Sequence, residues 1–111
     1  MTSDEVVRKK LEEGAWEEAL DEWKRTSNLT DEDLELIKEL GLLEEYEFFW
    51  DPHVGRVGFE SSSIPKNWKS QDYADKIKSW GQVSKINMAL SDLGDIGRRI
   101  LEEEYLELEL K

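Results

Sequence analysis

The stretch Tyr46-Glu47-Phe48-Phe49-Trp50-Asp51-Pro52-His53-Val54-Gly55-Arg56-Val57-Gly58-Phe59-Glu60 decides the fold. Apolar and polar residues alternate on both sides of its centre, which is the period-2 pattern of half-buried strands. Asp51-Pro52 and Gly55 favour a turn between them, because Pro presets φ and Gly accepts a positive φ. We therefore predict an antiparallel hairpin with strands at about 45–50 and 56–60. Five of the eleven aromatic residues lie in this stretch, so we expect it to nucleate the core.

Apolar residues recur at helical spacing on both sides of the hairpin. Ahead of it, we expect helices at 4–13 and 15–26, or one helix weakened at Gly14, with Ser3 as the N-cap. Thr30 and Asp33 form an acidic capping box that opens a third helix, and Gly41 is a natural stop. After the hairpin we expect Ser70 to cap a helix at 71–80, followed at Gly81 by a second helix at 82–103. Three small residues, Ser91, Gly94 and Gly97, lie along one side of this last helix and would let another backbone approach closely.

The C-terminal tail, Tyr105-Leu106-Glu107-Leu108-Glu109-Leu110-Lys111, also alternates. Its pattern predicts a third strand at about 105–110, and the alternative is a helical end. The whole chain, 1–111, has the length of a single domain. We predict an α+β fold in which four to five helices pack on a small antiparallel sheet. A winged-helix-like fold is the alternative, with 31–40 as the groove-reading helix, although the carboxylates of that segment would repel phosphates.

The segment Gly14-Ala15-Trp16-Glu17-Glu18-Ala19-Leu20-Asp21-Glu22-Trp23 resembles the second-helix region of a tetratricopeptide repeat. The likeness consists of a Gly, an aromatic residue two positions later, and then an Ala and a second aromatic residue. It covers about twenty residues, and the sequence has no second copy at the period that such arrays need. The resemblance implies that two helices pack as a hairpin, and we take no function from it.

The formal net charge is −12, and residues 1–50 alone carry 16 acidic and 6 basic side chains. DNA duplexes and anionic membranes need a basic surface, so we expect neither as a partner. The chain has no cysteine, which fits a reducing compartment. Its N-terminus has no signal-peptide pattern, and no apolar run is long enough to cross a membrane. These observations favour a cytoplasmic protein.

Motifs for catalysis or cofactor binding are absent from the sequence. A single histidine, His53, lies in the predicted turn, and neither a paired-His zinc motif nor a phosphate-binding glycine loop occurs. Asp31, Asp33 and Glu35 imitate the start of a calcium loop, but Leu36 stands where that loop needs Gly. We therefore expect no metal, no cofactor and no enzymatic activity.

The remaining hypothesis is binding to another protein, as an adaptor, a complex subunit or an inhibitor or immunity-type partner. Electrostatic complementarity to the acidic N-terminal half would speed association. Trp68 lies among lysines, so we expect it to be an exposed anchor. The candidate interaction surface comprises Phe49, His53, Arg56, Lys66, Trp68 and Lys69. Two alternatives are single-stranded nucleic-acid binding through the Lys/Trp surface around Trp68 and Trp80, and nucleic-acid mimicry by carboxylates such as Glu32, Glu35 and Glu39. The partner's identity and the oligomeric state are open.

Overall fold

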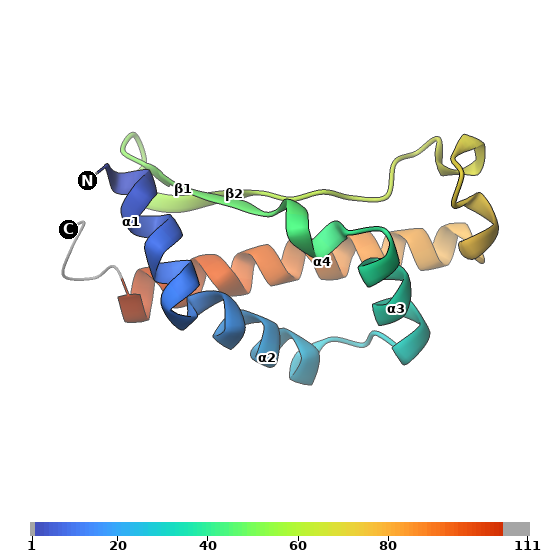
Figure 1. Ribbon diagram of the computed structural model, residues 1–111, viewed down its shortest axis with the longest axis horizontal. Coiled ribbons are helices and arrows are strands. Elements are labelled where there is room, and N and C mark those ends of the chain that lie inside the picture. The colour runs from blue at the N-terminus through green and yellow to red at the C-terminus, as the bar shows by residue number, and fades with distance from the viewer. Residues whose placement is uncertain (1, 106–111) are drawn as a thin grey trace.

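The computed structural model describes residues 2–105 of the chain. Its α-helices are α1 (Ser3–Lys10), α2 (Trp16–Thr26), α3 (Asp31–Glu39) and α4 (Trp80–Ile100), and its strands are β1 (Glu47–Asp51) and β2 (Arg56–Glu60). π-helical turns follow α1 (Leu11–Ala15) and α4 (Leu101–Tyr105), and 3-10 turns span Leu42–Glu45, Trp68–Ser70 and Ala74–Lys76. The helix α4 runs along the molecule, with the hairpin on one side and α2 and α3 on another (Figure 1). The mixed α+β class is therefore as predicted.

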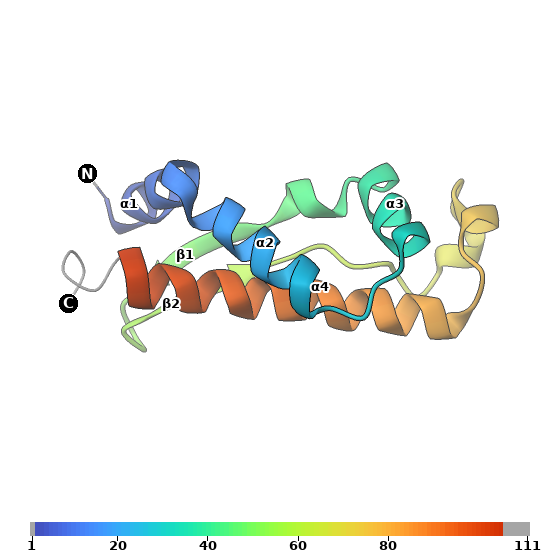
Figure 2. The ribbon, with the colours of Figure 1, turned by 90° about the horizontal axis from the view of Figure 1, so that it is seen from below.

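The expected number of four to five helices is wrong. Helical turns run without a break from Ser3 to Thr26, from Asp31 to Glu39 and from Trp80 to Tyr105, so the described residues form three continuous helical segments. At Gly14 the first segment bends, because this residue has a φ of 145° inside the π-helical turn. Figure 2 shows α1 and α2 joined end to end across this bend rather than folded back as a helical hairpin. The side chain of Thr2, not Ser3, accepts the capping hydrogen bond of α1.

The predicted helix at 71–80 is also wrong. One 3-10 turn, Ala74–Lys76, lies in this region, and α4 begins only at Trp80. The cause is a second capping motif, in which the Ser79 side chain accepts from the backbone N–H of Gln82 while the Gln82 side chain accepts from the backbone N–H of Lys78. The spacing Ser-x-x-Gln is a known helix-start signature. Gly81 lies inside the first turn of α4 instead of separating two helices.

The hairpin has the predicted antiparallel pairing, with Phe48 opposite Phe59 and Trp50 opposite Val57. Gly55 adopts a φ of 66° and its N–H donates to the carbonyl of Asp51, which closes the turn. In the described residues the sheet has these two strands. Residues 106–110 of the predicted third strand lie outside the described part, and Tyr105 ends a helical turn.

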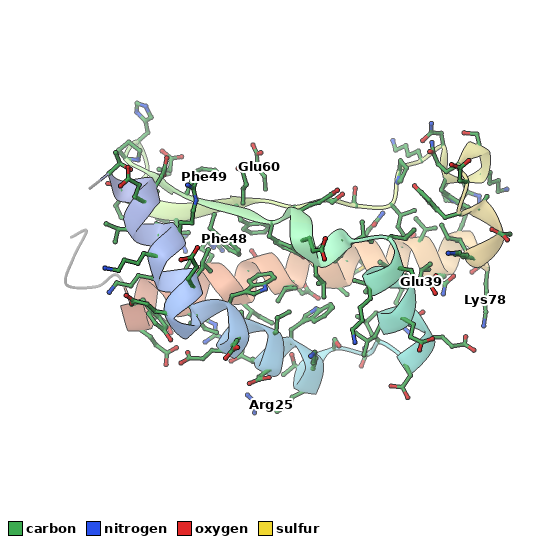
Figure 3. The ribbon with its side chains drawn as sticks, viewed as in Figure 1. Arg25, Glu39, Phe48, Phe49, Glu60 and Lys78 are labelled. Carbon is green, nitrogen blue, oxygen red and sulfur yellow. The ribbon has the colours of Figure 1, made fainter. Side chains whose placement is uncertain are left out.

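Of the three small residues predicted to admit another backbone, Gly94 and Gly97 contact aromatic rings instead, and Ser91 is exposed. A Cβ added at Gly94 would lie 2.0 Å from the ring of Phe59, and one at Gly97 would lie 2.7 Å from the ring of Phe48. Both rings therefore pack directly on the helix backbone. Figure 3 shows Phe48 directed into the molecule, whereas Glu60 points away from α4. Trp23 of α2 completes the core, because its buried indole N–H donates to the carbonyl of Ala89 at 2.9 Å.

The N-termini of α3 and α4 meet at Asp33, the one charged residue among the buried residues of the described chain. The capping box of Thr30 and Asp33 is formed as predicted. Asp33 also accepts a hydrogen bond from Gln82 at 3.1 Å and pairs with Lys85 at 2.9 Å. Burial by itself would raise the pKa of this carboxyl, but Lys85, Gln82 and Thr30 outweigh burial and lower the pKa to about 2. Asp33 therefore joins the N-terminal ends of α3 and α4 through hydrogen bonds and an ion pair.

Within residues 2–105, no helix combines the length and the apolarity that a membrane span requires.

Candidate functional site

The six residues predicted for an interaction surface fall into two separate groups. Phe49, His53 and Arg56 belong to the hairpin, and residues 66–69 belong to the loop that leads toward α4. The hairpin tip and this loop lie at opposite ends of α4 (Figure 1). They do not form one continuous surface.

In the hairpin group, Phe49 is half-buried because its ring covers Gly58 of the neighbouring strand. A Cβ at Gly58 would lie 2.6 Å from that ring, so the glycine makes room for it. His53 is exposed in the turn, and its backbone N–H donates to the Asp51 side chain. Arg56 is exposed and lies 3.5 Å from the carboxylate of Glu102. These contacts explain all three residues as parts of the hairpin itself.

In the loop group, the expectation that Trp68 is exposed is wrong. Trp68 is only 5% exposed, whereas Trp80 at the start of α4 is 49% exposed. The two rings meet edge to face with their centroids 5.4 Å apart. The ammonium of Lys69 lies 5.7 Å and 5.8 Å from the two ring centroids, a cation–π arrangement. Trp80 therefore presents the aromatic surface that the sequence suggested for Trp68.

The lysines that follow this loop are paired with α3. Lys76 lies 3.1 Å from Glu39, Lys78 contacts Glu32, and Lys85 pairs with Asp33. Figure 3 labels Glu39 and Lys78, which lie toward the same end of the molecule. These contacts use both the basic side chains that would bind a nucleic acid and the carboxylates that would imitate one.

A different feature, which the sequence did not indicate, is an apolar groove of about 440 Å³. It lies between the bent α1–α2 segment and the chain that enters β1. Its lining consists of Leu11, Trp16, Leu43, Tyr46 and Phe48, together with the exposed Glu12 and Glu44. Its size falls in the range of binding pockets, roughly 300–1,000 Å³, and apolar side chains dominate such pockets.

Three aromatic rings build the floor of the groove. The ring of Trp16 lies 5.2 Å from that of Tyr46 and 5.9 Å from that of Phe48, measured between centroids. Tyr46 and Phe48 are near parallel, 6.2 Å apart. The Tyr46 hydroxyl donates to the carbonyl of Leu90, and burial raises the pKa of this phenol. The floor therefore consists of three rings packed against one another, and the proton of its one hydroxyl is already donated to Leu90.

The groove forms where two glycines redirect the chain. Gly14 bends the first helical segment, and this places Leu11 and Trp16 on either side of the bend. Gly41, with a φ of 67°, ends α3 and starts the 3-10 turn that carries Leu43 and Glu44. Trp16 of the bent segment is half-buried. The one sequence signal for the site was the position of Gly14 and Gly41 beside apolar residues.

A larger cavity of about 500 Å³ lies on the other side of the C-terminal end of α4. Charged residues dominate its lining, and they are paired: Arg56 with Glu102, Arg98 with Asp95, and Arg99 with Glu22. Near it, a hydrogen bond in which Glu104 donates to the Glu18 carboxylate raises the pKa of Glu104, but both side chains are exposed and solvent screens their interaction. No set of three or more His, Cys, Asp or Glu side chains within residues 2–105 is arranged to hold a metal ion.

Comparison with known proteins matches no curated protein and no solved structure. Residues 3–111, nearly the whole chain, match a family of unknown function, DUF7992, and the chain belongs to this family.

Proposed function

We propose that this protein binds another protein, and that the groove between the α1–α2 bend and the entry to β1 is the binding site. The observation that carries the proposal is a groove lined by five apolar or aromatic side chains, of which four are half-buried and Phe48 is buried. An apolar surface bordered by charge is characteristic of interaction sites. The activity proposed is therefore binding, in an adaptor, a complex subunit or an inhibitor or immunity-type partner, and not catalysis.

The charge distribution supports the same site. Within residues 2–105, the carboxylates of Glu12 and Glu44 form no ion pair, whereas those of Glu32, Asp33 and Glu39 are paired with lysines. Unpaired negative charge therefore remains beside the groove, where it can accelerate encounter with a positively charged partner. We further propose that the protein acts in the cytoplasm, which the absence of cysteine supports.

The two nucleic-acid alternatives have less support. Single-stranded nucleic-acid binding would use Trp80 and Lys69, but Lys76 and Lys78 are paired within the chain. Nucleic-acid mimicry by α3 would use Glu32, Glu35 and Glu39, and two of these, Glu32 and Glu39, are the partners of these same lysines. Neither alternative has a surface of one charge sign in this region.

The test is affinity capture with the full chain from extracts of the cells that make it. The wild type should retain a partner that Leu43→Glu loses, because a carboxylate in the apolar groove would have to be desolvated on binding. Met88→Glu is the matched control, since Met88 is 69% exposed and lies on α4 away from the groove. Both variants must keep the wild-type melting temperature to within a few degrees.

The captured partner is then purified and its association rate measured at several salt concentrations. The rate should fall steeply as salt rises, because unpaired carboxylates border the site. If every captured protein binds Leu43→Glu as well as the wild type, the groove is not the binding site.

A further inference from the structure

We infer that the groove accepts a segment of a partner protein that carries one large apolar side chain flanked by lysine or arginine. This inference rests on the proposed function and specifies the chemistry of the partner. It follows from the apolar side chains that line the groove and from the carboxylates that border it.

The side chain that enters the groove must be apolar. Five of the seven lining residues offer hydrocarbon or ring surface, and the hydroxyl of Tyr46 already donates to the carbonyl of Leu90. A hydroxyl or amide of the partner that enters between these five residues would lie mainly against hydrocarbon and ring atoms, and a buried polar group without a hydrogen-bond partner is costly. A leucine, methionine or phenylalanine side chain avoids this penalty and contacts the rings of Trp16 and Phe48.

The residues that flank this side chain must be basic. Glu12 and Glu44 lie on opposite sides of the groove, one from the π-helical turn and one from the 3-10 turn. Both are exposed and form no ion pair within residues 2–105. The chain continues from Glu44 with two more exposed carboxylates, at Glu45 and Glu47. A segment that crosses the groove therefore meets negative charge on both sides of its apolar anchor.

A second copy of this chain is the competing occupant. Its exposed Trp80, with Lys69 beside it, has the same chemistry of an apolar anchor and a basic neighbour. Docking of this end into the groove of the next copy would be a head-to-tail contact, which produces rings or open filaments. Such a contact would appear as self-association that depends on protein concentration.

The experiment selects peptides from a random twelve-residue display library on the immobilised full chain, with Leu43→Glu for counter-selection. The enriched sequences should share a large apolar residue with at least two lysines or arginines around it. A synthetic peptide of that consensus is then measured by calorimetry. The double variant Glu12→Gln/Glu44→Gln should weaken its binding about tenfold at low salt. The double variant Glu35→Gln/Asp92→Asn changes the net charge equally at exposed positions away from the groove, and it should change the affinity less than about twofold.

Neutral or acidic consensus sequences, a library without enrichment, or equal affinity for the Glu12/Glu44 double variant would each overturn the inference. Concentration-dependent self-association that Leu43→Glu abolishes would also overturn it, because a second copy would then fill the groove. A captured partner that needs Leu43 but contacts the groove through a segment without basic residues would leave the proposed function standing and remove only this inference.

Discussion

Asp33→Asn should destabilise the protein at neutral pH by an amount that the pKa of Asp33 predicts. Asparagine has the shape of the neutral carboxyl, so the substitution removes the charge and also one of the two oxygens that accept from Thr30, Gln82 and Lys85. The pKa of Asp33 falls from 3.8 to about 2 in the folded chain. Each pKa unit corresponds to about 1.4 kcal/mol, so the ionised carboxylate contributes about 2 kcal/mol to the free energy of unfolding.

The sign of the pH dependence follows from the lowered pKa. The contribution of a group whose pKa is lowered by folding is complete above its unfolded value, here about 3.8, and is lost as the pH falls through about 2. The difference between wild type and Asp33→Asn should therefore be constant from pH 7 to about pH 5. It should shrink steadily below pH 4, while effects of the other carboxylates cancel in the comparison.

Urea unfolding of both proteins at intervals between pH 7 and pH 2.5 measures this difference. Asp31→Asn is the matched control, because Asp31 is exposed in the same first turn of α3 and interacts mainly with the helix dipole. That control should cost no more than about 0.5–1 kcal/mol. A difference for Asp33→Asn that stays the same at all pH values, or one no larger than that of Asp31→Asn, would refute the role of the Lys85–Gln82–Thr30 cluster.

Four further substitutions test the packing. Gly94→Ala should lower the free energy of unfolding by about 1–3 kcal/mol, because the added Cβ would collide with the ring of Phe59. Gly81→Ala is the control: the nearest atom to its Cβ is 3.6 Å away, so it should raise the free energy of unfolding by up to about 1 kcal/mol. Equal effects of the two substitutions in urea unfolding would contradict this packing. Trp23→Phe should cost about 1–3 kcal/mol, since it removes the hydrogen bond to Ala89 and leaves a cavity, and an unchanged melting temperature would argue against a packed indole. Tyr46→Phe should cost about 1 kcal/mol at pH 7. Because burial raises the pKa of the Tyr46 phenol, this variant should keep every tyrosine that ionises in the ordinary pH range when tyrosine absorbance is titrated with alkali. Loss of a tyrosine that ionises in the ordinary range would contradict the buried hydrogen bond of Tyr46.

Local signals in the sequence determined the hairpin, its turn and the third helix. Alternation fixed which residues of the hairpin face the core, because successive side chains of a strand point to opposite sides. Gly55 and Gly41 both take the positive φ that their positions required, and the Thr30–Asp33 capping box is formed. The Ser79–Gln82 capping motif was equally visible in the sequence, and it would have placed the start of α4 correctly.

Only the tertiary structure decided which side chains are covered and which charges are paired. Trp68 and Trp80 have similar neighbours in the sequence, yet one is buried and the other exposed, because burial depends on residues that are distant along the chain. Trp16 is half-buried because the rings of Tyr46 and Phe48, about thirty residues later in the chain, cover only part of it. The groove and the unpaired carboxylates beside it arise from the meeting of two segments about thirty residues apart, which no local pattern in the sequence records.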